Sequence, residues 1–306
     1  MKKLTNFVNA SCVSFFARVP HISFFTRALR ALIFASKARI STSFATSCLL
    51  ALFVVTLFTI TSCSKKQAQG DLLAHVMAKG ELVIATEGTW APWTYHDEND
   101  KLVGFDVEVA EKIAEKLGVR ATFVEAEWDG IFAGIDSKRY DIAANGVEIT
   151  DERSQKYDFS VPYAYIRTAI ITRTDRNDIL SFEDLRGKTT ANSLGSTYAE
   201  LAESYGAKTT TIDSFDQTLE LVLHRRVDAT LNAEVSFYDY MSVHPEAPFK
   251  VSVLTQDASL VALPLRKGAD TAALRDAIDS AIAELASSGE LAAISVKYFG
   301  SDITEE

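Results

Sequence analysis

Residues 104–128 read GFDVEVAEKIAEKLGVRATFVEAEW, and this stretch carries the two periodicities of an α/β fold. Its apolar residues recur at helical spacing up to Leu117, and Gly118 is placed to end the helix. Residues 120–128 then predict a strand. Strands are also predicted at 81–90 and 140–146, and a helix at 129–139, which together make a βαβαβ unit. These strands are too apolar to be half exposed, so we expect helices on both faces of the sheet.

A second α/β unit is predicted from Gly187 onward. Strands are expected at 188–195, 207–213 and 227–233, with helices at 197–205, at 214–226 and from Glu234. Long extended segments at 163–175 and 250–268 leave and re-enter the first unit, and helices over 270–289 and 290–300 follow. We therefore predict two α/β lobes joined by two extended crossings, with a cleft between the lobes and hinges near 163–167 and 257–262. The expected boundaries are 81–166 for lobe 1, 167–257 for lobe 2, 258–300 for the return to lobe 1, and 301–306 for a tail.

The first 63 residues differ in composition from the rest of the chain. They contain seven Lys and Arg and no acidic residue, and no charge occurs from Phe44 to Ser62. This apolar run ends in Ile60-Thr61-Ser62-Cys63, which resembles a bacterial lipobox. We predict a leader with a lipoprotein signal over 1–63, lipidation at Cys63, and a polar tether with a short helix over 64–80. An uncleaved membrane anchor is the alternative, and both readings place the remainder outside the cytoplasm.

Charge and cysteine content exclude several classes of function. Without the leader the chain has 24 of its 31 Lys and Arg against 41 Asp and Glu, a net charge of about −17. Such a surface repels nucleic acid and anionic lipid, so membrane attachment must come from a lipid or an apolar segment. The three cysteines, Cys12, Cys48 and Cys63, allow no disulfide framework in the mature part. We find no phosphate loop, metal cluster or nucleophile elbow, and expect no cofactor, metal or catalytic residue.

Residues 143–153, AANGVEITDER, place Glu148 and Arg153 five residues apart just after a predicted buried strand. Between Leu82 and Gly300 the chain resembles the bacterial extracytoplasmic solute-binding proteins for polar amino acids, which serve ABC importers, and is most similar to their cystine-binding branch. The matching segments are EGTWAPWTYHDENDKLVGFDVEVAEKIAEKLG, WDGIFAGIDSKRYDIAANGVEITDERSQKYDFSVPY, LRGKTTANSLGSTYAEL, RVDATLNAE and GELAAISVKYFG.

The resemblance implies the two-lobed periplasmic-binding-protein fold (type II) and a set of ligand contacts. Arg153 would clamp the α-carboxylate with its bidentate fork, and Ser196, just before a helix, would add a hydroxyl and a backbone N–H. Trp90 and Trp128 would line or stack on the ligand. Trp93 would be mainly structural. The remaining expected contacts are Glu87 at the distal end of the ligand, the backbones of Asn145 and Gly146, and Asn232. A competing interpretation pairs Arg153 with Asp151 or Asp158 on a surface turn.

Two positions depart from the family pattern. Glu148 stands where the family usually has Ser or Thr, and Ala233 stands where lobe 2 usually has an aspartate for the α-ammonium. Our hypothesis is that Glu148 replaces this aspartate, so that Glu148 and Arg153 together hold a zwitterion. The alternatives are that Glu234 takes the ammonium role through a register shift, or that the ligand is not an α-amino acid.

The resulting prediction is a monomeric, lipid-anchored receptor that captures a polar amino acid, with cystine favoured, and delivers it to an ABC permease in the cytoplasmic membrane. It is expected at the extracytoplasmic side of that membrane and to bind no nucleic acid. An enzyme of the same fold, of the cyclohexadienyl dehydratase type, is the alternative, and would need a general acid over a prephenate-like ring.

Overall fold

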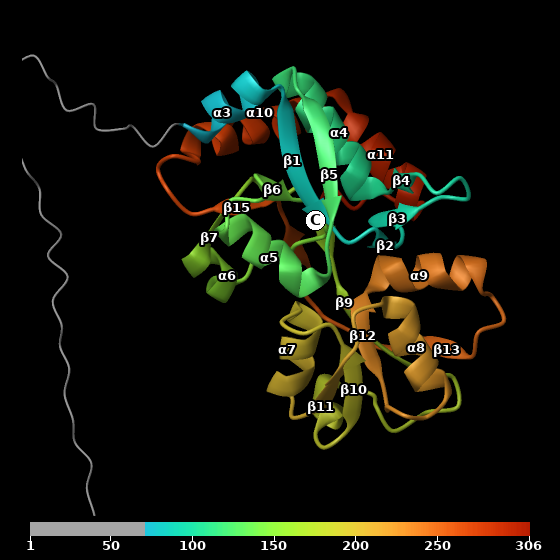
Figure 1. The fold of residues 1–306 in the computed structure, drawn as a ribbon. Helices are drawn as coiled ribbons and strands as arrows, with labels where there is room; N and C mark the ends of the chain where they lie inside the picture. Colours follow the sequence, from blue (N-terminus) through green and yellow to red (C-terminus); the bar gives the residue numbers. More distant parts are fainter. Residues whose placement is uncertain (1–70) are drawn as a thin grey trace, which may run out of the picture. The chain divides into compact units, whose positions relative to one another are not determined.

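The structure, a computed structural model, describes residues 71–306, which form two α/β lobes joined by a pair of strands (Figure 1). The predicted leader, Cys63 and residues 64–70 of the predicted tether lie outside these residues. Within residues 71–306 no helix combines the length and the apolar run that crossing a bilayer requires.

Lobe 1 is built on a five-stranded sheet in the order β5-β1-β6-β15-β7. β1 pairs in parallel with β5 and β6, whereas β15 is antiparallel to β6 and β7. The elements of this lobe are α3 (Leu72–Lys79), β1 (Glu81–Thr86), β2 (Thr89–Trp90), β3 (Thr94–His96), β4 (Leu102–Val103), α4 (Phe105–Leu117), β5 (Arg120–Glu125), α5 (Trp128–Asp136), β6 (Ile142–Ala143), α6 (Asp151–Lys156), β7 (Tyr157–Phe159), β15 (Pro264–Arg266), α10 (Ala272–Ser288) and α11 (Glu290–Phe299).

Helices cover both faces of this sheet, as its apolar strands predict. Alternate residues of β1 point to opposite sides: Ile84 belongs to the apolar cluster that includes Ile113 of α4, and Ala85 to the cluster that includes Ile131 of α5. The predicted end of α4 is confirmed, because Gly118 has φ +70° and its N–H bonds to the Ala114 carbonyl.

Lobe 2 combines a parallel strand pair, β10 with β11, and an antiparallel sheet in the order β12-β9-β13. A parallel bridge between Thr190 and Ala229 connects β10 to the segment before β12. The elements of this lobe are β9 (Thr168–Arg173), η1 (Phe182–Leu185), β10 (Thr189–Asn192), α7 (Thr197–Ser204), β11 (Lys208–Thr211), α8 (Phe215–Leu223), β12 (Thr230–Ala233), α9 (Glu234–Val243) and β13 (Phe249–Leu254).

Two short strands connect the lobes. β8 (Ala164–Ile166) and β14 (Ser259–Val261) form an antiparallel pair, with Ala164 opposite Val261. These are the two segments that the sequence predicts as crossings, and the extended run 163–175 proves to contain both β8 and β9. The predicted two-lobed fold is therefore confirmed, with both crossings side by side.

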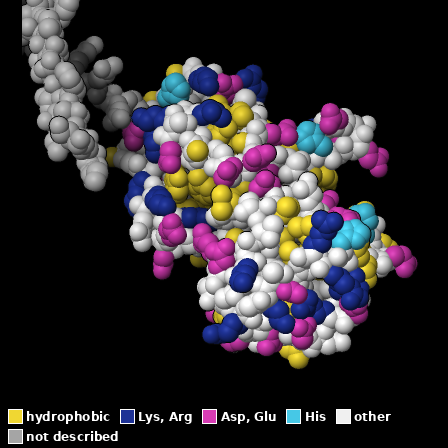
Figure 2. Space-filling view, turned by 60° about the horizontal axis from the view of Figure 1, so that its bottom comes forward, with side chains coloured by type: hydrophobic (Ala, Val, Ile, Leu, Met, Phe, Trp, Pro, Cys, Tyr) yellow, Lys and Arg dark blue, Asp and Glu magenta, His cyan; other side chains and the backbone are white. Residues whose placement is uncertain are grey.

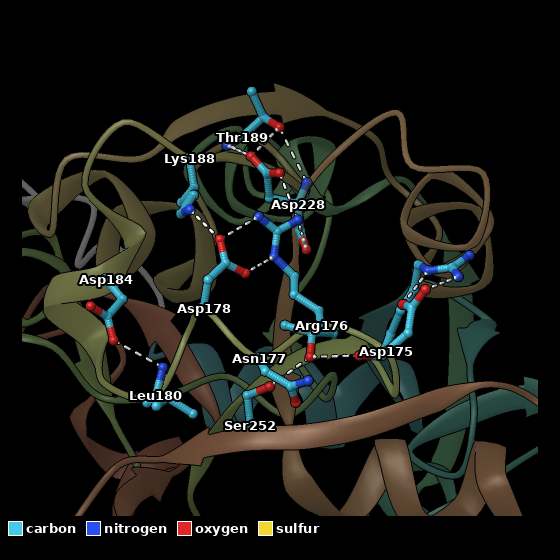
Figure 3. A network of polar contacts seen from close by, with 12 residues as sticks. Asp175, Arg176, Asn177, Asp178, Leu180, Asp184, Lys188, Thr189, Asp228 and Ser252 are labelled. Carbon is cyan, nitrogen blue, oxygen red and sulfur yellow. Dashed lines mark hydrogen bonds and ion pairs between the residues drawn. The ribbon is translucent and has the colours of Figure 1, made fainter.

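An ion-pair network holds together the part of lobe 2 away from the cleft (Figure 3). Asp228 accepts hydrogen bonds from the Thr189 N–H (2.7 Å), the Thr189 hydroxyl (2.9 Å) and the Arg176 guanidinium (2.7 Å). Asp178 pairs with the other side of Arg176 and with Lys188. Burial acts to raise the pKa of Asp228, but these hydrogen bonds outweigh it and lower the pKa below its ordinary value.

We predict that Asp228→Asn lowers the free energy of unfolding by about 2–3 kcal/mol, because the amide cannot satisfy three donors at once. Asp178→Asn is the control with a smaller expected loss, since the Asp178 side chain is 54% exposed. Because the pKa of Asp228 is lowered by folding, its contribution is present at neutral pH and lost as the pH falls through its folded-state pKa. Urea unfolding at pH 7 and pH 3 measures both effects; equal losses from the two variants at pH 7 would contradict the prediction.

Candidate ligand-binding site

A pocket of about 560 Å3, open solvent at its mouth included, lies between the two lobes. The residues that line it come from both lobes and are mostly polar or aromatic. They are Glu87, Thr89, Trp90, Trp128, Asn145, Gly146, Glu148, Arg153, Asn192, Ser193, Ser196, Thr197, Tyr198, Asp213, Phe215, Thr218 and Asn232.

The fold explains why these residues meet. Glu87 follows β1 and Asn145 follows β6, while in lobe 2 Ser193 follows β10 and Asp213 follows β11. Each lies just beyond the carboxyl end of its strand. In open α/β sheets ligands bind at this end, because loops and helix N-termini project there.

All nine residues predicted as ligand contacts line this one pocket, although they are spread over more than 140 positions of the sequence. The tenth predicted site residue, Cys63, lies outside the described residues. The structure thus brings the predicted set together; the role of each member in binding stays a prediction.

Arg153 is buried and faces the pocket without an anionic partner. It is 8% exposed, and its guanidinium donates to the Glu148 carbonyl (3.0 Å) and the Gly195 carbonyl (3.3 Å). The guanidinium lies over the ring of Trp128 at 5.2 Å from its centroid. Burial lowers the pKa of Arg153, opposed by the charge of Glu148. Among residues 71–306 no carboxylate forms an ion pair with it, so the competing surface-turn pairing with Asp151 or Asp158 is wrong.

Glu148 presents a second, opposite charge to the same pocket. It is 5% exposed, and a single antiparallel bridge to Val261 holds its backbone against the hinge strand β14. Its carboxylate accepts a hydrogen bond from the Thr197 hydroxyl of lobe 2. Glu148 and Arg153 make no ion pair with each other; the carbonyl of Glu148, not its carboxylate, contacts the guanidinium. Both charges therefore remain available to a ligand.

Two stacked indoles lie beside the pocket, next to the small sheet β2-β3-β4. Trp90 and Trp93 lie 5.4 Å apart with 17° between their planes. Trp90 lines the pocket and its Nε1 donates to Asn232 (3.2 Å), while Trp93 is fully buried and donates to Ser236 (3.0 Å). Trp93 is thus a packing residue, as expected, and both indoles bond across the cleft to lobe 2.

Gly146 is a position that only glycine fits without strain. Its φ is +55°, and a Cβ there would come within 2.6 Å of the Trp90 ring. Its N–H is donated to the buried Asp106 carboxylate, so the expected backbone contact with the ligand would have to use the carbonyl and stays a prediction. The bare backbone of Gly146 makes room for Trp90, which in turn faces the pocket.

Glu87 and Asn145 form a hydrogen-bonded pair at one end of the pocket. The Asn145 amide donates to the Glu87 carboxylate (2.6 Å) and its carbonyl oxygen accepts from the Glu87 N–H (2.8 Å). Asn145 thus contributes its side chain here. Burial raises the pKa of Glu87 to about 7, with a smaller lowering by Asn145 and a further rise from the charge of Asp213.

Ser196 is the N-cap of α7. Its hydroxyl accepts from the Ala199 N–H (3.1 Å) and donates to the Ser193 carbonyl (2.8 Å), and its own N–H also bonds to Ser193 (3.2 Å). In this structure both donors of Ser196 are directed at Ser193, and the expected contact of its hydroxyl and backbone N–H with a ligand stays a prediction. What it supplies is the start of a helix aimed at the pocket, which favours an anion there.

Glu234 lies outside the pocket. Its carboxylate is held by Arg167 through two hydrogen bonds of 2.9 and 3.1 Å. Ala233, one residue earlier, is fully buried. The register-shift alternative, in which Glu234 would hold a ligand ammonium, is therefore not supported.

The sequence did not single out the other lining residues. Thr197 and Tyr198 directly follow the quoted Ser196, Asp213 ends the predicted strand 207–213, and Phe215 lies at the start of the helix predicted over 214–226. Counting residues past strand ends would have found them. Among residues 71–306 no group of His, Cys, Asp and Glu is arranged to hold a metal ion. Figure 2 shows acidic and basic side chains interspersed on the face in view.

Comparisons with known proteins agree with this geometry. Residues 82–301 match the family model of bacterial extracellular solute-binding proteins, family 3. The chain is 40% identical over 267 residues to the L-cystine-binding protein TcyA of Bacillus subtilis, covering 84% of this chain and 98% of TcyA.

Two solved structures also bear on the arrangement of the lobes. The L-cystine solute receptor of Neisseria gonorrhoeae, unliganded and open, is 38% identical with a TM-score of 0.54, covering 78% of this chain and 100% of that one. An ancestral arginine-binding protein bound to glutamine is 34% identical and has a TM-score of 0.68, and the match covers 72% of this chain and 99% of that one. The better fit to the bound protein agrees with the hydrogen bonds that join the lobes here. Fold, pocket and comparisons together establish that the chain belongs to the bacterial extracellular solute-binding proteins, family 3.

Proposed function

We propose that this protein captures a polar amino acid in the cleft between its lobes, with cystine favoured, as the receptor of an ABC importer. The observation that carries the proposal is the pair of buried, opposite and mutually unpaired charges, Glu148 and Arg153, in one pocket. An α-amino acid carries both complementary charges, on an ammonium and a carboxylate group bonded to the same carbon atom. A buried charge without a partner costs free energy, which a zwitterion returns on binding.

A second group of acidic residues in the pocket supports cystine over shorter amino acids. Glu87 of lobe 1 and Asp213 of lobe 2 add two carboxylates there. Cystine has a second ammonium for them, and the relatives named for cystine add weight to this choice. Lysine, arginine and glutamine also carry a distal N–H donor and remain candidates.

The proposal extends to the attachment and organisation of the chain. We infer a leader over 1–63 and lipidation at Cys63, which would anchor the protein to the extracytoplasmic side of the cell membrane. We also infer that the protein is a monomer and that its partner is an ABC permease. The lobe boundaries proposed are 81–166, 167–257 and 258–300. Support for this part comes from the lipobox-like Ile60–Cys63 sequence and from the extracellular setting of the family.

Isothermal calorimetry tests the ligand. Lipid-free residues 65–306, which include the compact unit Gln67–Glu306, are titrated with cystine, lysine, arginine, glutamine and histidine. We expect a saturable response to cystine with a dissociation constant in the micromolar range or tighter, which corresponds to a binding free energy of about −8 kcal/mol or more negative. A response to another amino acid would correct the ligand; silence to all five would refute the amino-acid receptor.

We predict that affinity for a ligand with a distal cation rises as the pH increases from 6 to 7.5. Because burial raises the pKa of Glu87 to about 7, this carboxyl is partly protonated there and must ionise to pair with the cation. Binding should release protons near pH 6.5, and the heat should depend on the buffer. Glu87→Gln should remove both effects, and a wild-type affinity that is flat over this range would contradict the role of Glu87.

The stability of the ligand-free protein should change in the opposite direction. A carboxyl whose pKa is raised by folding contributes stability below its unfolded pKa of about 4.3, and loses this contribution as the pH rises through 7.

An enzyme of the same fold remains the second candidate. Its dianionic, prephenate-like substrate would meet three carboxylates in this pocket, Glu87, Glu148 and Asp213, which argues against it. Incubation with prephenate and arogenate, followed by detection of the aromatic product, tests this candidate directly; turnover would replace the receptor by the enzyme.

A further inference from the structure

Two buried side-chain oxygens of lobe 2, in residues that line the pocket, have no hydrogen-bond partner among residues 71–306. They are the Tyr198 hydroxyl oxygen and Asn192 Oδ1. The residues are only 8% and 3% exposed. Buried polar atoms in folded proteins nearly always have a partner, so two unpaired oxygens on one pocket wall indicate a partner that the chain itself does not supply.

The Tyr198 hydroxyl lies among the charged groups of the pocket. It is in the first turn of α7, which begins at Thr197. Burial raises its pKa well above the usual value, and the charges of Glu148 and Glu87 raise it further, while the Ala233 N–H and Arg153 act against the rise. The hydroxyl therefore stays neutral and can both accept and donate a hydrogen bond. The Ala233 N–H is itself donated to Asn232 Oδ1 (2.9 Å), which leaves the Tyr198 hydroxyl without a hydrogen bond of good geometry.

Asn192 is the last residue of β10, and its orientation is fixed by the other end of its amide. Nδ2 donates to the Leu231 carbonyl (2.7 Å) and lies 3.5 Å from the Thr230 hydroxyl. Turning the amide over would place two oxygens against each other at Leu231. The carbonyl oxygen is thus the unpaired end, and it can only accept a hydrogen bond.

An ammonium group suits these two acceptors. It carries three N–H donors in a compact, strongly hydrated charge, so it needs several oxygens when it leaves water. Glu148 supplies one anionic oxygen, which balances the charge. Ala233, whose backbone lies near the Tyr198 hydroxyl, has no side-chain oxygen to offer. Two neutral oxygens can complete the coordination without adding a third buried charge.

We propose that the Tyr198 hydroxyl and Asn192 Oδ1 are ligand contacts that accept hydrogen bonds from the α-ammonium of the bound amino acid, on the opposite lobe from Glu148. This inference rests on the proposed function. It makes Tyr198 a specificity-determining residue, because a ligand without N–H donors at this position leaves both oxygens unpaired.

Tyr198→Phe tests the proposal, with Tyr157→Phe as the matched control. Tyr157 is also buried, at 7% exposed, but it lies outside the pocket and its hydroxyl donates to Asp136 (3.2 Å). Calorimetry with the amino acid that binds the wild type gives the affinity, and thermal unfolding without ligand gives the melting temperature.

The two variants should behave in opposite ways. Tyr198→Phe should weaken binding roughly 10- to 100-fold, as expected for loss of a hydrogen bond to a charged group, and leave the melting temperature unchanged or higher. Tyr157→Phe should lower the melting temperature and leave affinity unchanged. Wild-type affinity in Tyr198→Phe would overturn this inference alone, whereas a wild type that binds none of the five amino acids would overturn the proposed function and this inference together.

Discussion

Arg153→Gln is expected to abolish high-affinity binding, weakening it by about 3–5 kcal/mol or roughly 10²- to 10⁴-fold. The guanidinium is the positive group in the pocket wall described here, and its two backbone contacts together with Trp128 hold it in place before the ligand arrives. A ligand carboxylate taken from water then gains a positioned, permanently charged fork. Glutamine keeps much of the length but neither the charge nor the fork, so a buried carboxylate would be left without its counter-ion. Calorimetry against the wild type measures the loss.

Arg139→Gln is the matched control for this variant. Arg139 also lies over an aromatic ring, at 5.6 Å from the centroid of Tyr140, but it is exposed and does not line the pocket. Its loss should leave affinity unchanged. Thermal unfolding without ligand should show that Arg153→Gln remains folded, because the substitution removes a buried charge with no anionic partner. A folded Arg153→Gln protein with affinity within threefold of the wild type would contradict the carboxylate clamp.

The chain order of strands and helices could be read from the sequence because its periodicities are local. The apolar spacing between Phe105 and Leu117 and the stop at Gly118 require no knowledge of tertiary contacts. The pairing of the two crossings, β8 with β14, follows less directly. Their residues are almost a hundred positions apart, and only the need to connect both lobes twice brings them together.

The pocket residues were predictable where chemistry alone selects them. A guanidinium and a carboxylate just past a buried strand are unusual enough to mark Arg153 and Glu148. The use of individual atoms was not predictable. Whether the Ser196 hydroxyl faces a ligand or caps its own helix depends on the turn at Ser193, and whether the Gly146 N–H is free depends on Asp106, forty positions earlier.

Tyr198 is a pocket residue that the sequence did not single out. In the sequence it is one position of the helix predicted over 197–205, and the structure buries it. Its unpaired hydroxyl becomes visible only when the neighbouring strand end is in place. Sequence patterns thus locate the cleft, while hydrogen-bond accounting across the two lobes decides which atoms remain for a ligand.

Glu148→Gln is expected to weaken amino-acid binding by about 3–5 kcal/mol, because the ligand ammonium would lose its anionic partner while remaining buried. The substitution preserves shape, and the amide oxygen can still accept from Thr197, so the contact between the lobes should survive. Thr197→Val is the control, because it removes this hydroxyl but keeps the carboxylate. It should weaken the binding free energy by about 1 kcal/mol. If both variants lose affinity equally, Glu148 acts by holding the lobes together and not by charge. If Glu148→Gln binds as the wild type does, the ammonium is balanced elsewhere, and the remaining carboxylates of the pocket, Glu87 and Asp213, are the groups that could balance it.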